Sequence, residues 1–215
     1  MEIEKKKINF LGDSITEGVG VSSPDHKFVN CFLSKYNPAI VRNYGISGSR
    51  IAKQQSPAPG NPSYERYFAT RVSEMDTDAD IVVVFGGVND YAHGDAPLGC
   101  FEDNTSDTFY GACHVLMTAL INQFPMATII FMTPLHTEVT PQNKIGTPAP
   151  LIEYVRAIRE VAESYAIPIL DLYSMSGINA NIPSQREKMI PDGIHPNDIG
   201  AERIADRLAG FLRSL

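Results

Sequence analysis

Short apolar runs rich in β-branched residues alternate along this sequence with longer segments in which apolar residues recur every three or four positions. The short runs, each typical of a strand, are 8–11, 39–43, 81–85, 128–132 and 167–170. Strands that alternate with helices fold into βαβ units around a parallel sheet. Because runs 81–85 and 128–132 lack polar alternation, we expect helices on both faces of these two strands, at the centre of the sheet.

Three segments, 106–124, 151–166 and 198–212, carry the helical periodicity. Three others, 54–62, 90–104 and 133–150, are rich in turn-forming residues and predict long loops. Loops of this length in a compact domain are often functional, so we expect them to shape a substrate pocket.

The length of 215 residues and the composition fit one ordinary globular domain, spanning 1–215. A formal net charge of -7 gives an average field that repels polyanions, which argues against nucleic acid as a partner. Cys31, Cys100 and Cys113 are widely spaced and lack the paired spacing of a zinc site or a redox motif. We therefore interpret them as small, reduced residues.

The sequence also argues against export and membrane insertion. The apolar run 8–11 is far shorter than the apolar region of a signal peptide. No stretch elsewhere approaches the ~20 apolar residues that a membrane-spanning helix needs. These features predict a cytoplasmic protein and leave its oligomeric state open.

A serine follows the first predicted strand, in the segment Gly12-Asp13-Ser14-Ile15. In an open α/β sheet, ligands bind outside the carboxyl ends of the strands, at the point where the strand order reverses. Ser14 would lie in that crevice, where its hydroxyl could act as a nucleophile. The alternative is that Ser14 only caps the following helix, because serine is common at that position.

Two more turns, which contain Gly48 and Asn89, follow the second and third predicted strands. A glycine lets a backbone amide approach a ligand closely, and an asparagine offers a side-chain amide. Either turn alone needs no catalytic explanation. Parallel strands, however, would bring Ser14, Gly48 and Asn89 to one edge of the sheet.

The segment before the last predicted helix reads Asp192-Gly193-Ile194-His195-Pro196. An Asp three residues before a His can accept the hydrogen of the imidazole Nδ1, which leaves Nε2 free to act as a base. The alternatives are a surface Asp-His pair or two ligands of a metal ion. No further cluster of His, Asp or Glu at ligand spacing supports a metal, so we expect neither metal nor cofactor.

These four segments together resemble the ordered sequence blocks of the SGNH (GDSL) hydrolases, a family of serine esterases and lipase-like acyl hydrolases. They occur in the order of the family and span nearly the whole chain. The chain has Ile15 where the family has Leu after the serine, a conservative departure. The resemblance implies a flavodoxin-like three-layer α/β/α sandwich with a central parallel sheet of about five strands.

The resemblance also implies the role of each residue. Ser14 would be the nucleophile, His195 the general base, and Asp192 the acid that holds the imidazole. The amides of Ser14 and Gly48 and the side chain of Asn89 would form the oxyanion hole. Gly48 is preferred over Gly45 because Ile46-Ser47-Gly48 aligns with the family block.

Several nearby residues have less specific expectations. We expect Asp13 to be a structural hydrogen-bonding residue, and His114 to be structural within its helix. We expect His136, just past the fourth strand, to lie outside catalysis, although it could line the pocket. Tyr44 and Tyr91 could supply pocket walls, whereas Met132 fits the core better.

A fold or a triad does not choose the substrate. The acidic sequence has no amphipathic helix rich in Lys and Arg, which disfavours an interfacial lipase. We expect a small-molecule partner, a short-chain acyl (acetyl) ester of a carbohydrate or other metabolite. The alternatives are a lysophospholipase or thioesterase, a metal-dependent hydrolase, and a carbohydrate-binding module of this fold without catalysis.

Overall fold

The computed structural model describes residues 1–56, 66–142 and 149–215 of the chain. Within these residues, five parallel strands form one sheet in the order β2-β1-β3-β4-β5. The strands are β1 (Lys7–Gly12), β2 (Ile40–Gly45), β3 (Ile81–Phe85), β4 (Thr128–Met132) and β5 (Ile169–Leu170). The predicted parallel sheet is therefore confirmed, and its strand order is that of flavodoxin-like folds.

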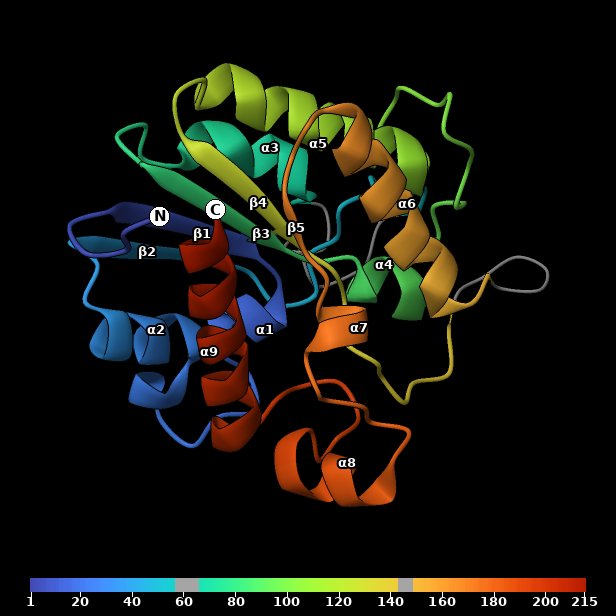
Figure 1. Cartoon of the computed structure of the whole chain (residues 1–215). Coiled ribbons are helices and arrows are strands. Elements are labelled where there is room, and N and C mark those ends of the chain that lie inside the picture. Colours follow the sequence, from blue (N-terminus) through green and yellow to red (C-terminus); the bar gives the residue numbers. More distant parts are fainter. Residues whose placement is uncertain (57–65, 143–148) are drawn as a thin grey trace.

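Helices cover both faces of the sheet (Figure 1). The helices α2 (Phe28–Tyr36) and α9 (Asp198–Ser214) pack together on one face. On the other face lie α3 (Phe68–Arg71), α5 (Phe109–Gln123) and α6 (Leu151–Ser164). The shorter helices are α1 (Ser14–Glu17), η1 (Pro24–His26), η3 (Val72–Glu74), α4 (Val88–Ala92), α7 (Leu172–Met175) and α8 (Pro183–Met189). This arrangement confirms the three-layer α/β/α prediction.

The central strand β3 shows why both faces need helices. All five of its residues are buried. Val83 contributes to the core under α2 and α9, whereas Val82 and Val84 contribute to the core under α5 and α6. Successive side chains of a strand point to opposite faces, so a continuous apolar run needs an apolar cover on each side.

The predicted element boundaries are close to those observed, and the differences have local causes. Helix α5 begins at Phe109, three residues later than predicted, because the Oγ1 of Thr108 caps it by accepting the N–H of Gly111 at 3.2 Å. Helix α9 begins at Asp198 as predicted, and Asn197 caps it. The predicted loop 90–104 begins inside α4, and parts of the predicted loops 54–62 and 133–150 lie outside the described residues.

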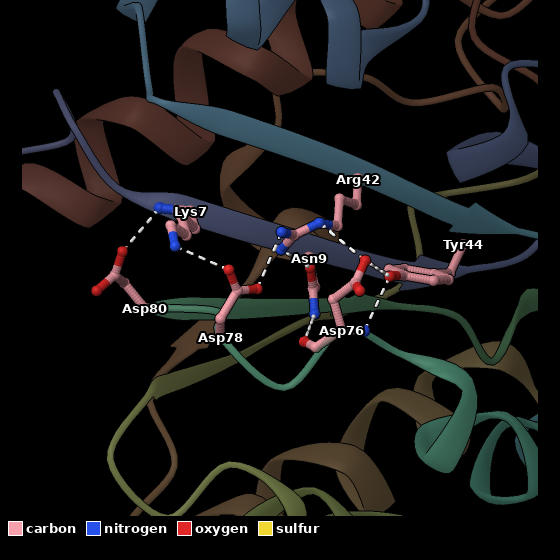
Figure 2. A network of polar contacts seen from close by, with 7 residues as sticks. All are labelled: Lys7, Asn9, Arg42, Tyr44, Asp76, Asp78 and Asp80. Carbon is pink, nitrogen blue, oxygen red and sulfur yellow. Dashed lines mark hydrogen bonds and ion pairs between the residues drawn. The ribbon is translucent and has the colours of Figure 1, made fainter.

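A network of charged and polar side chains connects the edge strand β2 to its neighbours (Figure 2). Arg42 pairs with Asp76 and with Asp78, each at 2.9 Å, and Lys7 pairs with Asp78 at 2.8 Å. The buried Asn9 donates to the main-chain oxygen of Asp76 at 2.8 Å. These contacts hold the segment before β3, which contains Asp76 and Asp78, against strands β1 and β2.

Among the helices of the described residues, none combines the length and the apolar character that crossing a membrane requires.

Candidate active site

Ser14 lies where strand β1 ends and the chain turns into the short helix α1. Strand β1 has β2 on one side and β3 on the other. Ser14 therefore lies at the point where the strand order reverses. The residue that caps α1 is Asp13, whose Oδ1 accepts the N–H of Ile15 at 3.0 Å. The capping alternative for Ser14 is therefore wrong, and Asp13 has the structural role expected of it.

The structure brings Ser14, His195 and Asp192 into one hydrogen-bonded chain. The Oγ of Ser14 lies 2.9 Å from Nε2 of His195, although 181 positions separate the two residues in sequence. On the other side of the ring, Nδ1 lies 2.6 Å from Oδ2 of Asp192. This geometry fits an imidazole that carries its proton on Nδ1 and can accept another at Nε2.

The carboxylate of Asp192 is held by the backbone of its own loop. Its Oδ1 accepts the N–H of His195 at 2.7 Å and the N–H of Ile194 at 2.9 Å. Partial burial alone would raise the pKa of Asp192, but these backbone bonds and the imidazole together lower it below its ordinary value. Asp192 is therefore ionised at neutral pH and can stabilise a positively charged imidazole.

Gly48 and Asn89 are joined through the residue that follows the glycine. Asn89, on α4, donates from Nδ2 to the main-chain oxygen of Ser49 at 3.1 Å. Its neighbour Asp90 accepts the N–H of Ile51 at 2.9 Å and that of Ala52 at 2.8 Å. Hydrogen bonds thus join the turn after β2 to the helix after β3.

Asp13, which precedes Ser14 in the sequence, has an unusual environment. The residue is 1% exposed, and its Oδ2 is buried with no hydrogen-bond partner among the described residues. Burial is the main reason that the pKa of Asp13 rises to about 7; Asp90 raises it further, whereas the N–H of Ile15 and the cation of Arg71 lower it. Nothing in the sequence indicated that the pKa of this carboxyl group would be raised.

Arg71 is buried near the carboxyl ends of strands β1 and β2. This arginine is 2% exposed and donates to the main-chain oxygen of Gly12 at 2.9 Å and to that of Tyr44 at 3.1 Å. These carbonyls belong to the last residue of β1 and to the last residue but one of β2. A buried guanidinium therefore supports the strand ends that present Ser14 and Gly48.

Three other residues discussed in the sequence analysis, His114, His136 and Met132, lie in different parts of the fold. His114, on α5, lies 2.9 Å from the main-chain oxygen of Phe101 and 3.2 Å from the hydroxyl of Tyr165, which fits a structural role. His136 stacks on Tyr173, with 3.7 Å between the ring centroids, and burial lowers its pKa. Met132 is fully buried in the core, as expected.

The two tyrosines differ in their surroundings. Tyr91, on α4 two residues after Asn89, donates to the main-chain oxygen of Val139 at 3.3 Å. Tyr44 instead bonds through its hydroxyl to Asp76 at 2.9 Å, within the network of Figure 2. The hydroxyl of Tyr44 therefore takes part in the polar contacts at the sheet edge.

Sequence reasoning did not single out Glu17, which ends helix α1. Its Oε2 accepts the N–H of Ser47 at 2.6 Å and also accepts the hydroxyl of Ser47. The two residues are 30 positions apart, so no spacing pattern in the sequence could pair them. The only signal was the position of Glu17 in the same segment as Ser14.

The arrangement can perform acid-base and nucleophilic chemistry. A hydroxyl faces a ring nitrogen, a carboxylate holds the ring, and the side-chain amide of Asn89 lies on the helix after β3. Over residues 1–56, 66–142 and 149–215, no group of three or more His, Cys, Asp or Glu side chains is arranged to hold a metal ion.

The model of the GDSL-like lipase/acylhydrolase family matches residues 10–203. Among curated proteins, none matches this sequence.

Solved structures extend the comparison. A protein from Lactobacillus plantarum is 32% identical, with a TM-score of 0.85 over 99% of this chain and 98% of its own. The aryl esterase of M. smegmatis is 19% identical, with a TM-score of 0.65 over 98% of this chain and 99% of its own. LAE5, an alpha/beta hydrolase from the metagenome of Lake Arreo, is 20% identical, with a TM-score of 0.64 over 97% and 95%. At these lower identities, the last two comparisons show a shared fold.

Proposed function

Since the chain belongs to the GDSL-like lipase/acylhydrolase family, we propose that it hydrolyses carboxylic esters through an acyl-enzyme formed on Ser14. The observation that carries this proposal is the hydrogen-bonded chain from the Oγ of Ser14 through the imidazole of His195 to Asp192. A serine hydroxyl is a weak nucleophile until an adjacent base can take its proton.

In the first step, the Oγ of Ser14 bonds to the ester carbonyl carbon while its proton passes to Nε2 of His195. Asp192, ionised and bonded to Nδ1, stabilises the imidazolium that results. When the tetrahedral intermediate collapses, the bond to the alcohol oxygen breaks and His195 gives that oxygen the proton. Water, activated by the same imidazole, then releases the acid and restores Ser14.

The oxyanion of each intermediate would accept the backbone N–H groups of Ser14 and Gly48 and the amide of Asn89. The bond to Ser49 uses one of the two hydrogens on Nδ2 of Asn89 and leaves the other for the oxyanion. Removing one such donor typically costs about 10² to 10³ in turnover.

For the substrate, our proposal is a short acyl group, acetyl above all, on a carbohydrate or another small metabolite. The net charge of -7 and the scarcity of basic amphipathic segments support a small dissolved ester over a lipid at an anionic surface.

The test measures hydrolysis of p-nitrophenyl acetate, butyrate and octanoate by the wild type and by Ser14→Ala. We expect the highest kcat/KM with acetate and a rate at the level of the uncatalysed reaction for Ser14→Ala. Equal rates for the two proteins would refute Ser14 as the nucleophile, and no turnover of any ester by the wild type would favour the binding module.

Two further measurements separate the remaining alternatives. A preference for octanoate would overturn the short acyl group in favour of a lysophospholipase or thioesterase. Labelling of Ser14 by a fluorophosphonate, with activity unchanged by a chelator, is the result expected of the serine mechanism and excludes a metal-dependent hydrolase.

A further inference from the structure

The turn that carries Gly48 has a defined geometry. The N–H of Ser49 donates to the main-chain oxygen of Ile46 at 3.1 Å, so Ser47 and Gly48 are the two central residues of a β-turn. Gly48 has a φ of 74°, whereas the non-glycine residues with positive φ in the described chain are Lys5, Asn37 and Ala166, which excludes Ser47. Negative φ followed by positive φ is the pattern of a type II turn.

In a type II turn, the central peptide is flipped relative to a type I turn. Here that peptide joins the carbonyl of Ser47 to the N–H of Gly48. Glycine adopts negative and positive φ almost equally well, so Gly48 itself does little to oppose the flip. Contacts of the neighbouring residue Ser47, whose Cα begins that peptide, can therefore help to set the direction of the Gly48 N–H.

Glu17 is the residue that holds it. One carboxylate oxygen accepts both the N–H of Ser47, at 2.6 Å, and the hydroxyl of the same residue. Glu17 ends the short helix that Ser14 begins, so one helical turn bears the nucleophile and contacts the turn with Gly48. Hydrogen bonds to an ionised acceptor are stronger than those between neutral groups.

Helix α1 and strand β2 also pack closely against each other through their backbones. Asn43 donates from Nδ2 to the main-chain oxygen of Thr16 at 2.6 Å and accepts the N–H of Gly45 at 2.8 Å. A Cβ atom at Gly45 would lie 2.2 Å from the backbone nitrogen of Glu17, a distance that only glycine permits. Glu17 is therefore presented to Ser47 from a fixed position.

We propose that Glu17 is a positioning residue, which keeps the peptide between Ser47 and Gly48 in the orientation that directs the Gly48 N–H at the oxyanion. This inference rests on the proposed ester hydrolysis and extends it to a residue that does not touch the substrate. Its effect belongs to the transition state, where negative charge develops on the carbonyl oxygen, and not to substrate binding.

The test compares Glu17→Ala with Glu17→Gln, which keeps an acceptor oxygen but removes the charge. For Glu17→Ala we expect kcat to fall about 10-fold with KM nearly unchanged, less than the full loss of a donor because Ser14 and Asn89 still donate. A boronic acid that forms a tetrahedral adduct on Ser14 should bind this variant about 10-fold more weakly. Glu17→Gln should retain most of both properties.

A matched control is Glu202→Ala. Glu202 is also an exposed carboxylate with a hydrogen bond, accepting from Nζ of Lys35 at 3.1 Å on the surface between α2 and α9. We expect its kcat, KM and boronic acid affinity to equal those of the wild type. Ser47→Ala, which loses only the hydroxyl contact, should give a smaller loss than Glu17→Ala, and the double variant should be no worse than Glu17→Ala.

Amide hydrogen exchange measures the contact without relying on activity. Exchange of the Ser47 N–H should be slow in the wild type and in Glu17→Gln and faster in Glu17→Ala. The inference is overturned if a folded Glu17→Ala keeps the wild-type kcat, if Glu17→Gln loses as much as Glu17→Ala, or if Ser47 exchanges equally fast in all three proteins. Activity that persists in Ser14→Ala refutes the proposed function itself, which separates the two failures.

Discussion

Replacing Asp13 by asparagine should change how the stability of the protein depends on pH. The pKa of Asp13 is about 7 in the folded protein, against an ordinary value of 3.8, mainly because the carboxyl group is fully buried. Between these two values the folded protein keeps a proton that the unfolded chain has lost. The free energy of unfolding therefore falls as pH rises through this range and levels off above the folded pKa.

The size of the effect follows from the width of that window. Each pH unit within it lowers the free energy of unfolding by about 1.4 kcal/mol. From about pH 5 to about pH 8, Asp13 should therefore destabilise the wild type by about 3 kcal/mol. The Asp13→Asn variant has no titrating carboxyl group at this position, and the amide oxygen can still cap Ile15. The variant should therefore gain stability relative to the wild type as pH rises.

Urea unfolding followed by circular dichroism, at pH values across this range, measures the difference between the two proteins. Subtracting one curve from the other removes the titrations that both proteins share. Asp78→Asn is a useful control because its hydrogen bond with Lys7 lowers the pKa of Asp78, so its titration lies below the window and its difference from the wild type should be constant. A constant difference for Asp13→Asn would refute the reasoning and show that water or movement of the chain solvates the carboxylate.

Three other results are expected. Asn89→Ala should lower kcat by about 10² to 10³ with little change in KM, and an unchanged kcat would contradict its role at the oxyanion. Asp192→Asn should lower kcat by about 10³ or more, because the amide cannot stabilise the imidazolium of His195; a near-normal rate would remove Asp192 from the mechanism. Leu208→Ala, at a fully buried core position, should lower the free energy of unfolding by about 2–5 kcal/mol in urea titrations, and a negligible loss would mean that the core closes around the cavity.

Much of the sheet could be predicted because its strands are continuous apolar runs. Strands β3 and β4 coincide with the predicted runs 81–85 and 128–132, and both are covered by helices. Strand β5 is shorter than the predicted run 167–170, because only Ile169 and Leu170 pair with β4. Helix α2 was not predicted, although it supplies Phe28 and Phe32 to the core. Its nine residues are too few to show a clear helical period.

The meeting of Ser14, His195 and Asp192 could be expected for two reasons. Asp192 and His195 are close in sequence, so a single loop can bring the carboxylate to the ring. Ser14 follows a strand, and parallel strands all end at the same edge of a sheet. The positions of Gly48 and Asn89 after β2 and β3 follow from the same rule.

The sequence alone determined which side chains we propose for the chemistry and at which edge of the sheet they gather, because strand periodicity and local spacing are properties of neighbouring residues. Tertiary structure alone decided the acidity of Asp13, the burial of Arg71 beneath two strand ends, and the bond between Glu17 and Ser47. Each of these depends on solvent exclusion or on contact between segments far apart in the chain. Such effects arise only after packing has removed water and fixed the distance between the partners.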